Sequence, residues 1–525
     1  MKKLISLLLA ICILLSVAGC ADTPNETTGS TSPSAPVDTA NKEVPADTDV
    51  VLTINREDGN HVVLGVGTQL DPHFFSQNVG LSGVSDIGPW ECREEDWLLF
   101  EERIEQMGLQ RIRVMLQPGW YVINEANTRE GIYDWDTACM ESLYRVLDMA
   151  QRMSIKVNIT MWGIDTGSAA FMRQEGTSDW VTIPNENYEK LFVDCFADCI
   201  KYLIEEKGYS CIREVTLFNE PNSLYTGNDA NERYCNLCIQ MHESFQEKDI
   251  RDKVLFNLSD DARDYIWMAK TLMTLEGVID VANSHTYSLG DSYDADTQTS
   301  NRDMSNQKMC YELANYNLSL WKEWTDQYPD VPHIWGEFGT VNSVGSHQTV
   351  DKYSPERGLE IARIGLNFFN MGSRGMSYWV LFSHYYSRSD ANNGKIMDMG
   401  LWGFADEGYQ CRPVYYSYSM ITRFIQENDT IFPITSDDEN IVAVAFRQNG
   451  KWSYCVVNNG DTAKKVSFVN MDAYPDNLNR YVYEEAAVPT DNQVIKSNGS
   501  VEADGRVISD EIPPRSFVIY TDKDE

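Results

Sequence analysis

The feature that most constrains this chain is the alternation of short apolar segments with longer segments of helical periodicity. The apolar segments, which we expect to be buried strands, are 61–69, 111–116, 155–162, 214–218, 253–259, 278–287, 332–338 and 375–383. The helical patterns are 98–108, 139–153, 187–206, 230–248, 262–276, 308–324, 355–371 and 415–428. Such alternation is typical of parallel α/β folds. Eight repeats predict a (β/α)₈ TIM barrel over residues 51–428.

A doubly wound open sheet is the alternative architecture for the same alternation. That fold commonly places a glycine-rich phosphate-binding loop directly after its first strand. The segment 61–69 is followed by no such loop. The open sheet therefore has no dinucleotide signal to support it.

The pattern changes after the helical segment 415–428. Apolar residues alternate with polar ones in short runs, and Asn449-Gly450 and Asn459-Gly460 have the composition of two-residue hairpin turns. We expect residues 429–525 to form an antiparallel β-sandwich domain. Its role, structural support or carbohydrate binding, is left open by the sequence.

The first 50 residues have the composition of an export signal and a linker. Residues 1–20 begin with two lysines, continue through an apolar run over 4–16 and end in Val17-Ala18-Gly19-Cys20, which resembles a bacterial lipobox. We expect lipidation at Cys20 and anchoring at the extracellular face of a bacterial membrane; an ordinary signal peptide with a chance cysteine is the alternative. Residues 21–50 are rich in Ser, Thr, Pro and acids, as expected for a disordered linker.

The charge of the chain excludes one class of partner. The formal net charge is −36 over 525 residues. A surface of this sign repels phosphate backbones, so we expect no nucleic-acid partner. A neutral carbohydrate would not be repelled.

The cysteines raise the question of a metal cluster or disulfides. Cys195 and Cys199 lie four residues apart, and Cys235 and Cys238 three apart, but each pair falls on the apolar stripe of a helical segment. Free cysteines commonly fill such faces. We therefore expect core packing and no zinc site, and disulfide pairing cannot be read from the spacing.

Polar residues lie at the predicted ends of several strands, where the catalytic groups of a barrel enzyme are found. In chain order these residues are Arg113, Asn219, Glu220, His285, Tyr287, Glu337 and Trp379. His285 and Tyr287 are two residues apart and should face the same side of their strand. We therefore expect two glutamates facing each other across the barrel mouth, surrounded by polar and aromatic side chains.

Two carboxyl groups are what glycosidic cleavage requires. One protonates the leaving oxygen, and the other attacks the anomeric carbon or activates water. An arginine would favour the charged form of the attacking carboxylate, and a tyrosine would orient it. An amide can bind the sugar 2-hydroxyl, and an indole offers a flat platform for the ring. This chemistry needs no metal or cofactor.

The end of the fourth strand, Asn219-Glu220-Pro221, together with Glu337 on the seventh, resembles glycoside hydrolase clan A, whose members are retaining (β/α)₈ enzymes. The resemblance covers about 55–428 and is nearest to the cellulase-like family 5 and, less closely, to family 39. It implies that Glu220 is the acid/base, Glu337 the nucleophile and Asn219 the contact to the 2-hydroxyl. It also implies that Arg113, His285, Tyr287 and Trp379 bind the substrate around them.

The chain departs from the family 5 pattern at the third strand. Many family 5 enzymes have a histidine there, whereas this strand ends in Asn158, Thr160 and Trp162. The resemblance to the clan rests on the two glutamates, which this departure does not affect.

Other polar residues near strand ends have weaker positions. Asp260 and Asp261 are expected to be loop or helix-capping residues, and Asp280 lies inside a strand. Further candidate loop contacts are Gln69, Asp71, Trp120, Trp162 and Tyr225.

The predicted function is a retaining glycoside hydrolase of a β-linked polysaccharide or oligosaccharide. The alternatives are a transglycosylase with the same residues and a non-catalytic glycan-binding lipoprotein. Retention of both glutamates favours an enzyme. The sugar, the linkage and endo or exo cleavage depend on the loops 71–98, 117–136, 163–186 and 288–307.

Overall fold

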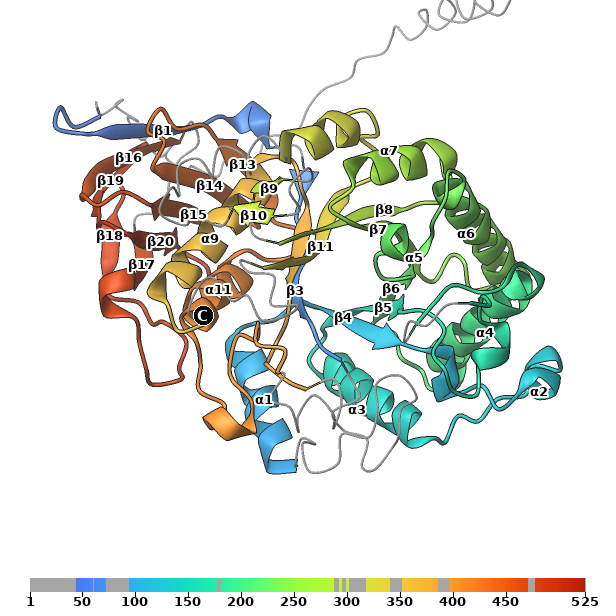
Figure 1. Ribbon diagram of the computed structural model, residues 1–525. Coiled ribbons are helices and arrows are strands. Elements are labelled where there is room, and N and C mark those ends of the chain that lie inside the picture. The colour runs from blue at the N-terminus through green and yellow to red at the C-terminus, as the bar shows by residue number, and fades with distance from the viewer. Residues whose placement is uncertain are drawn as a thin grey trace, which may run out of the picture. The chain divides into compact units, whose positions relative to one another are not determined.

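The protein is described by a computed structural model (Figure 1). The described residues are 44–59, 61–71, 94–176, 181–287, 318–339, 352–385, 396–470 and 477–524, with two short strands at 292–294 and 299–301. Residues 1–20, with Cys20, and most of the expected linker lie outside this set.

Eight parallel strands close into a barrel in the order β11-β12-β3-β4-β5-β6-β7-β8. Their bounds are β3 Gly65–Gln69, β4 Arg111–Leu116, β5 Lys156–Met161, β6 Ile212–Leu217, β7 Leu255–Ala262, β8 Val281–Tyr287, β11 His333–Gly339 and β12 Gly375–Tyr378. Each coincides with a strand predicted from the sequence, so the (β/α)₈ fold is confirmed. The short strands β9 (Ser292–Asp294) and β10 (Thr299–Asn301) form an antiparallel pair.

The helices follow the strands in the expected order. The α-helices are α1 Glu94–Gln106, α2 Glu125–Arg129, α3 Ala138–Arg152, α4 Glu189–Lys201, α5 Pro221–Leu224, α6 Ala230–Glu247, α7 Tyr265–Thr274, α9 Pro355–Asn370 and α11 Pro413–Phe424. A π-helical turn, Tyr202–Glu206, extends α4, and residues 318–325 are also helical. Short 3₁₀ turns occupy Arg56–Asp58, Pro118–Trp120, Ala170–Met172, Glu186–Tyr188, Ala405–Glu407 and Glu485–Ala487.

Local sequence explains where several helices begin. Thr137 and Ser354 are N-caps whose hydroxyls accept hydrogen bonds from backbone amides in the first turns of α3 and α9. Pro355 follows Ser354 at the first position of α9, where its fixed φ suits the helix. Asp264 caps α7 in the same way.

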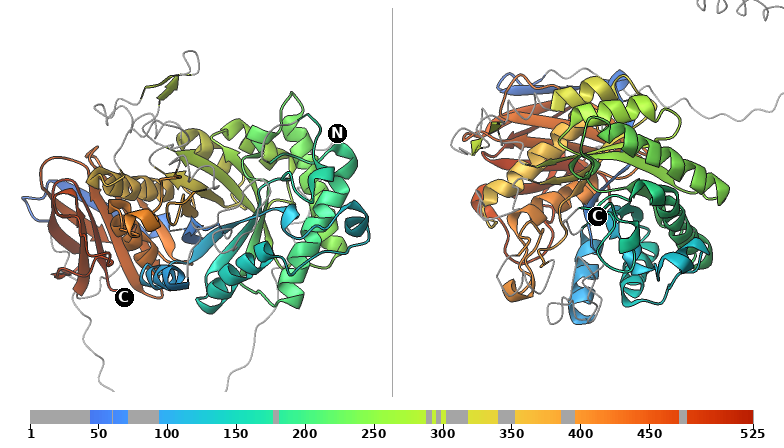
Figure 2. Two further views of the ribbon diagram at one scale, coloured as in Figure 1. Left: turned by 60° about the horizontal axis from the view of Figure 1, so that its bottom comes forward. Right: turned by 45° about the vertical axis from the view of Figure 1, so that its right-hand side comes forward.

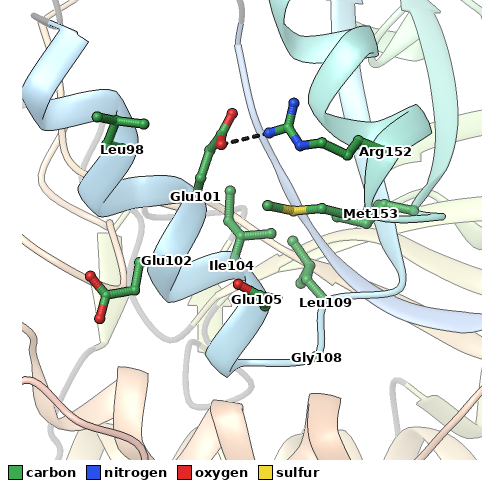
Figure 3. Close-up of a pocket in the computed structure, with 10 residues that line it drawn as sticks. Leu98, Glu101, Glu102, Ile104, Glu105, Gly108, Leu109, Arg152 and Met153 are labelled. Carbon is green, nitrogen blue, oxygen red and sulfur yellow. Dashed lines mark hydrogen bonds and ion pairs between the residues drawn. The ribbon is translucent and has the colours of Figure 1, made fainter.

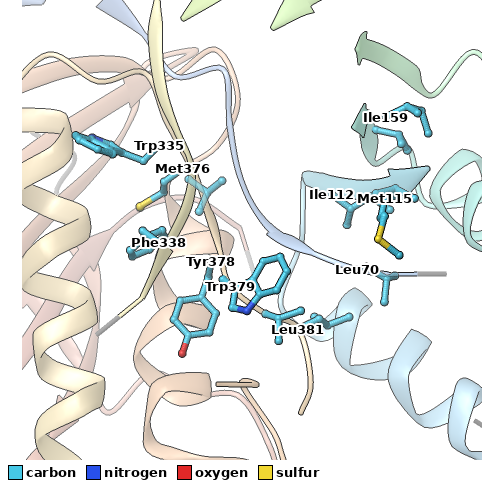
Figure 4. Packing of buried hydrophobic residues seen from close by; sticks show 14 of the residues in the cluster. Leu70, Ile112, Met115, Ile159, Trp335, Phe338, Met376, Tyr378, Trp379 and Leu381 are labelled. Atoms are coloured by element: carbon cyan, nitrogen blue, oxygen red, sulfur yellow. The ribbon is translucent and has the colours of Figure 1, made fainter. Parts of the chain in front are cut away.

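Apolar side chains fill the space between the barrel strands and the surrounding helices. Figure 4 shows Trp335, Phe338 and Met376 together on β11 and β12. The rings of Trp335 and Phe338 both pack against Phe368 on α9, with centroids 4.8 and 5.2 Å away. Both side chains therefore point outward, although they are three residues apart.

The C-terminal region forms the two sheets of a β-sandwich. One sheet has the order β18-β17-β20-β15-β14-β13-β2 and the other β1-β16-β19. The bounds are β1 Val50–Ile54, β2 His61–Val62, β13 Thr430–Ile434, β14 Ile441–Gln448, β15 Lys451–Asn458, β16 Lys464–Asn470, β17 Asn477–Glu484, β18 Ser500–Glu502, β19 Val507–Ile512 and β20 Ser516–Thr521. The predicted sandwich is confirmed.

The two predicted Asn-Gly turns have different outcomes. Asn449 and Gly450 have φ of 53° and 84° and join β14 to β15 as a two-residue hairpin, as predicted. Asn459-Gly460 does not make a hairpin, because β15 and β16 lie in different sheets. Instead, the side chain of Asn458 accepts a hydrogen bond from the amide of Gly460 at the crossing.

The sandwich contains strands that precede the barrel in the sequence as well as strands that follow it. β1 pairs with β16 in one sheet, and β2 pairs with β13 in the other. Val50–Ile54 and His61–Val62 thus belong to the sandwich sheets, although the predicted barrel began at residue 51. The sandwich and the barrel meet through α9 and α11, each of which contacts strands of both parts (Figures 1 and 2).

The described cysteines agree with a role in packing. Cys139, Cys195, Cys199, Cys211, Cys235, Cys238, Cys411 and Cys455 are all free and buried. The two pairs on α4 and α6 lie within the apolar core, as expected. In the part of the chain that the structure describes, no helix has the length and hydropathy needed to cross a membrane.

Candidate active site

The segment after β6 positions Glu220 at the carboxyl end of the barrel. The strand ends at Leu217, and Phe218 and Glu220 then adopt positive φ of 69° and 47°. Glu220 precedes α5, whose first residue is Pro221. Left-handed conformations of non-glycine residues are uncommon and cluster at functional sites. The turn directs the carboxyl group of Glu220 toward His285.

The same turn is fastened to the neighbouring strand β7. The backbone N–H of Glu220 donates to the carbonyl of Asp260 at 3.1 Å. The side chain of Asn222 accepts from the N–H of Ala262 at 2.8 Å and donates to its carbonyl at 3.1 Å. The sequence Asn-Glu-Pro-Asn therefore holds the ends of β6 and β7 together.

A bulge in β11 turns Glu337 into the barrel. The register against β8 shifts between Trp335 and Glu337, at Gly336. Trp335 and Phe338 point outward, so Glu337 between them points inward. A Cβ at position 336 would overlap the side-chain amide of Asn283, which accepts from the Gly336 N–H at 2.8 Å. Glycine is therefore required where Asn283 fixes the bulge.

His285 and Tyr287 on β8 contact the two glutamates, as their spacing predicted. The ring Nδ1 of His285 lies 3.1 Å from a carboxylate oxygen of Glu220 and 3.6 Å from one of Glu337. Its Nε2 lies 3.0 Å from Asp260. The hydroxyl of Tyr287 donates to the other oxygen of Glu337.

Arg113 on β4 connects four side chains, one of which is that of Glu337. Its guanidinium donates to Glu337 at 3.1 Å and to Asp260 at 2.6 Å. It also donates to the side-chain oxygens of Asn219 at 2.7 Å and Gln69 at 2.9 Å. Arg113 is fully buried, so this network fixes the relative positions of strand ends from β3, β4, β6, β7 and β11.

The two glutamates lie close together but differ in exposure. One oxygen of each carboxyl group and a nitrogen of His285 all lie within 4.8 Å of one another. The Glu220 side chain is 30% exposed and that of Glu337 only 8%. Groups at this spacing could surround a cation, but both nitrogens of His285 are bonded to carboxylates. A doubly protonated imidazole has no lone pair to offer a metal.

Burial and charge act against each other on the pKa values here. Burial raises the pKa of Glu337 to about 7, and Glu220 adds to this, although His285, Arg113 and Tyr287 lower it. The expected net ionising effect of Arg113 is therefore outweighed by desolvation. Burial opposes the charge of His285, but Asp260 and Glu337 raise its pKa to about 10. His285 is thus an imidazolium at neutral pH.

Two tryptophans lie beside this cluster. The ring of Trp379, just after β12, is 5.8 Å from that of Trp162, after β5. The guanidinium of Arg113 lies over the Trp162 ring at 5.4 Å. Both indoles are largely buried within the described structure. Trp379 is therefore linked to the cluster through Trp162, with little of its surface open, and its role as a platform for a sugar ring stays a prediction.

The candidate loop contacts fall into two groups. Gln69 and Trp162 contact Arg113, and Gln69 also donates to Asp71, so these three belong to the cluster. Tyr225 packs between Phe218 and Tyr234 in the core. Trp120 is buried, and its carbonyl accepts from the Thr137 hydroxyl at the start of α3.

Asp260 was expected to be a loop or capping residue, and that prediction is wrong. It lies within β7, is fully buried and binds Arg113, His285 and Asn283. Asn283, which the sequence did not single out, binds both Asp260 and the β11 bulge. The available signal was the apolar strand running directly into two aspartates. Asp261 bonds Ser284 instead, and Asp280 pairs with Arg251.

A cavity of about 520 Å³ lies at the opposite end of the barrel strands, between α1 and α3 (Figure 3). Glu101, Glu102 and Glu105 line it from α1, and Arg152 pairs with Glu101 at 2.5 Å. It borders the residues that precede β4 and β5. The catalytic residues of barrel enzymes lie at the carboxyl ends of the strands, so this cavity is not the candidate site.

Comparison with known proteins gives matches only at the level of structure. No family model matches the sequence, and no curated protein matches it. Three similar solved structures are a glycoside hydrolase family 30 subfamily 8 xylanase from Clostridium acetobutylicum, a family 39 β-xylosidase from Caulobacter crescentus and an endo-β1,6-glucanase. Their TM-scores are 0.59, 0.54 and 0.57, and their identities 14%, 12% and 14%. In each case 90% of this chain is covered, with 98%, 99% and 93% of the other chain.

At these identities the comparison establishes the fold. The chain shares the barrel-plus-sandwich architecture of glycoside hydrolases from families 30 and 39 along nearly its whole described length. The predicted resemblance to clan A barrels is confirmed at this level. Proximity to family 5 stays a prediction.

Proposed function

We propose that the protein is a retaining glycoside hydrolase that cleaves a β-linked polysaccharide or oligosaccharide. The observation that carries the proposal is the pair Glu220 and Glu337, whose nearest oxygens lie within 4.8 Å. Retaining enzymes place their carboxyl groups about 5–5.5 Å apart, whereas inverting enzymes need about 6.5–9.5 Å to admit water. The glycosidases of similar fold, named for xylan, xyloside and β1,6-glucan substrates, support the substrate class.

In the first step, an oxygen of Glu337 forms a bond to the anomeric carbon. The bond to the leaving oxygen breaks, and that oxygen keeps the electron pair and takes the proton of Glu220. Arg113 and Tyr287 donate to Glu337 and align its attacking carboxylate. The greater burial of Glu337 suits a group that reacts with carbon and not with bulk water.

In the second step, water attacks the anomeric carbon while Glu220, now ionised, takes its proton. The bond to Glu337 breaks, and both carboxyl groups return to their starting states. The imidazolium of His285 donates to Glu220 and stabilises its charge between the steps. Two inversions at the anomeric carbon give net retention.

The nucleophile is tested with Glu337→Gln on aryl β-glycosides. We expect kcat/KM to fall by about 10⁴-fold or more, because an amide cannot form the glycosyl-enzyme. Glu276→Gln, the same change at an exposed position before β8, is the control and should leave activity unchanged. Full activity in Glu337→Gln would overturn the assignment.

The acid/base is tested with Glu220→Ala. Loss of general acid catalysis should cost about 10²–10⁴-fold on substrates with poor leaving groups. Azide should restore part of the rate on activated substrates and yield a β-glycosyl azide. An inverted product anomer from the wild type, observed by NMR, would exclude the retaining mechanism while leaving a glycosidase.

We also propose that the protein is held at the bacterial surface by lipid on Cys20. The support is the lipobox Val17-Ala18-Gly19-Cys20 after a short apolar run. In a bacterial host fed a labelled fatty acid, the wild type should carry label and Cys20→Ala should not. Equal labelling of both would exclude this anchor.

A further inference from the structure

Asp260 is a buried carboxylate that the two-glutamate reaction does not itself use. Its side chain is fully excluded from solvent. One oxygen accepts from Arg113 at 2.6 Å, and the other accepts from His285 at 3.0 Å and from Asn283. A buried charge is costly unless it is paired and hydrogen-bonded. Asp260 meets that condition through two groups that both reach Glu337.

The backbone around Asp260 has an unusual conformation. Ser259 and Asp260 have φ of 81° and 46°, and the register of β7 against β8 shifts between Ser259 and Asp261. This bulge turns Asp260 into the barrel and Asp261 out of it. The carbonyl of Asp260 also accepts the backbone N–H of Glu220. Left-handed backbone at two successive non-glycine residues indicates a functional constraint.

His285 lies between Asp260 and the two glutamates. From β7 it faces Asp260 directly and Asp261 at longer range; from β6 it faces Glu220, and from β11 Glu337. Arg113 on β4 contributes the second positive charge, bonded to the same Asp260 and Glu337, and Tyr287 on β8 donates to Glu337. Without the carboxylate of Asp260, the two glutamates would be the nearest negative charges to the buried His285.

We propose that Asp260 is the positioning residue that keeps His285 doubly protonated, so that its Nδ1–H donates to Glu220 and its charge stands beside Glu337. Asp260 fixes the ring by accepting from Nε2, and it supplies the negative charge that offsets the burial of the imidazolium. The charge of His285 in turn stabilises the ionised form of Glu337 before attack and of Glu220 after proton donation. The kinetic part of this inference rests on the proposed glycosidase; the protonation of His285 does not.

The protonation of His285 is measured by ¹⁵N NMR on histidine-labelled protein. The chain has seven histidines, and loss of one signal in His285→Gln assigns the resonance. In the wild type we expect both ring nitrogens to remain protonated at pH 8, consistent with a pKa of about 10. A neutral His285 at pH 8 in the wild type would overturn the proposal without any substitution at Asp260.

Asp260→Asn keeps the shape of the side chain and removes its charge. We expect the pKa of His285 to fall by about 1–3 units, because an opposite charge in direct contact is lost. Asp261→Asn is the matched control. Asp261 is equally buried but bonds Ser284, and burial raises its pKa to about 8, so an amide resembles its neutral form. An unchanged His285 in Asp260→Asn, or an equal fall in both variants, would contradict the proposal.

The kinetic readout separates positioning from structural support. With its pKa lowered by about 1–3 from about 10, His285 in Asp260→Asn should lose its proton between about pH 7 and 9, so kcat/KM should decline on the basic side of the profile at lower pH than in the wild type. Asp261→Asn should keep the wild-type profile. A fall in rate with an unchanged profile would indicate a structural role only. If the wild type cleaves no glycoside, the proposed function fails, and the NMR result still decides the role of Asp260.

Discussion

At the scale of single residues, the ionisation of Glu337 depends on opposing effects of burial and of neighbouring hydrogen-bond donors. Desolvation raises its pKa to about 7, while the donors around it oppose that rise. A nucleophile must be ionised, so activity should decline as the pH falls through this value. The pH of that acidic limb therefore measures how far the surrounding hydrogen-bond donors lower the pKa of Glu337.

Tyr287→Phe removes one of these donors while leaving the ring. The hydroxyl bonds the charged form of Glu337 and lowers its pKa. A hydrogen bond to a charged group is worth about 1.5–3 kcal/mol, so its loss should raise the pKa of Glu337 by about one unit. The acidic limb of kcat/KM should move to higher pH by the same amount. Profiles of Tyr265→Phe, on the outer helix α7, serve as the control; a shift to lower pH would contradict the prediction.

The sequence predicted the glutamates but not Asp260, and the reason is geometric. Asn257 points inward, because its amide donates to Glu214 inside the barrel. Strict alternation from Asn257 would turn Asp261 inward and Asp260 outward. The β7 bulge shifts this phase by one residue. Bulges depend on tertiary contacts, which the sequence pattern does not reveal. The interpretation of Glu337 used its place at the end of the seventh strand and did not depend on the phase of alternation, although a bulge in β11 also turns its side chain inward.

At the scale of elements, β4 carries two buried arginines with different tasks. Arg113, the third residue of the strand, donates to the candidate nucleophile Glu337. Arg111, two residues earlier and on the same face, makes a bidentate pair with Glu214 at 2.6 and 2.7 Å. Asn257 donates to the same carboxylate at 2.6 Å. The amino-terminal end of a barrel commonly serves stability, and the carboxyl end chemistry.

Arg111→Met should therefore lower stability and leave the pH profile intact. The change strands the buried Glu214, and breaking a buried pair costs about 3–5 kcal/mol. Urea unfolding measures the loss. Arg152→Met breaks the pair with Glu101, in which the arginine is 56% exposed, and should cost no more than about 1 kcal/mol. If both substitutions lowered the free energy of unfolding by the same amount, the buried Arg111–Glu214 pair would contribute no more to stability than the exposed pair.

The positions of the elements followed from hydrophobic pattern, but their assignment to domains did not. Every barrel strand was predicted within a few residues because each is a short apolar run. β1 reads equally as a strand, yet its partner β16 is more than 400 residues away in sequence. No local signal specifies such a pairing. The same limit explains Asn459-Gly460. These residues have the composition of a hairpin turn, but the chain there crosses from one sheet to the other.

At the scale of the whole molecule, the barrel shares a core with one face of the seven-stranded sandwich sheet, and a second apolar cluster lies between the two sandwich sheets. The main cluster of buried apolar residues includes barrel positions and sandwich positions such as Phe446, Tyr481 and Phe517. Polar contacts reinforce the junction: Asn370 on α9 binds the backbone of Ala443 and Ile434. The sandwich is thus a structural partner of the barrel, whatever else it binds.

Gly358 on α9 tests whether the two parts unfold together. An added Cβ there would overlap the hydroxyl of Tyr483, which donates to the Pro355 carbonyl at 2.5 Å, and would lie 2.8 Å from the carbonyl of Pro413. We expect Gly358→Ala to cost about 1–3 kcal/mol through overpacking. Calorimetry should show one transition at a lower Tm, because the shared core couples the two parts.

Gly365→Ala, on the same helix, is the matched control. Its Cβ would meet the flexible end of Met376 on β12, at 3.0 Å, on the barrel side of α9. Both substitutions gain the same helix propensity, so their difference isolates the junction with the sandwich. Gly358→Ala should lose more stability than Gly365→Ala, and neither should alter the pH profile. Two separated transitions in Gly358→Ala would show that the sandwich folds independently of the barrel, and an unchanged Tm would show that the junction tolerates the extra carbon.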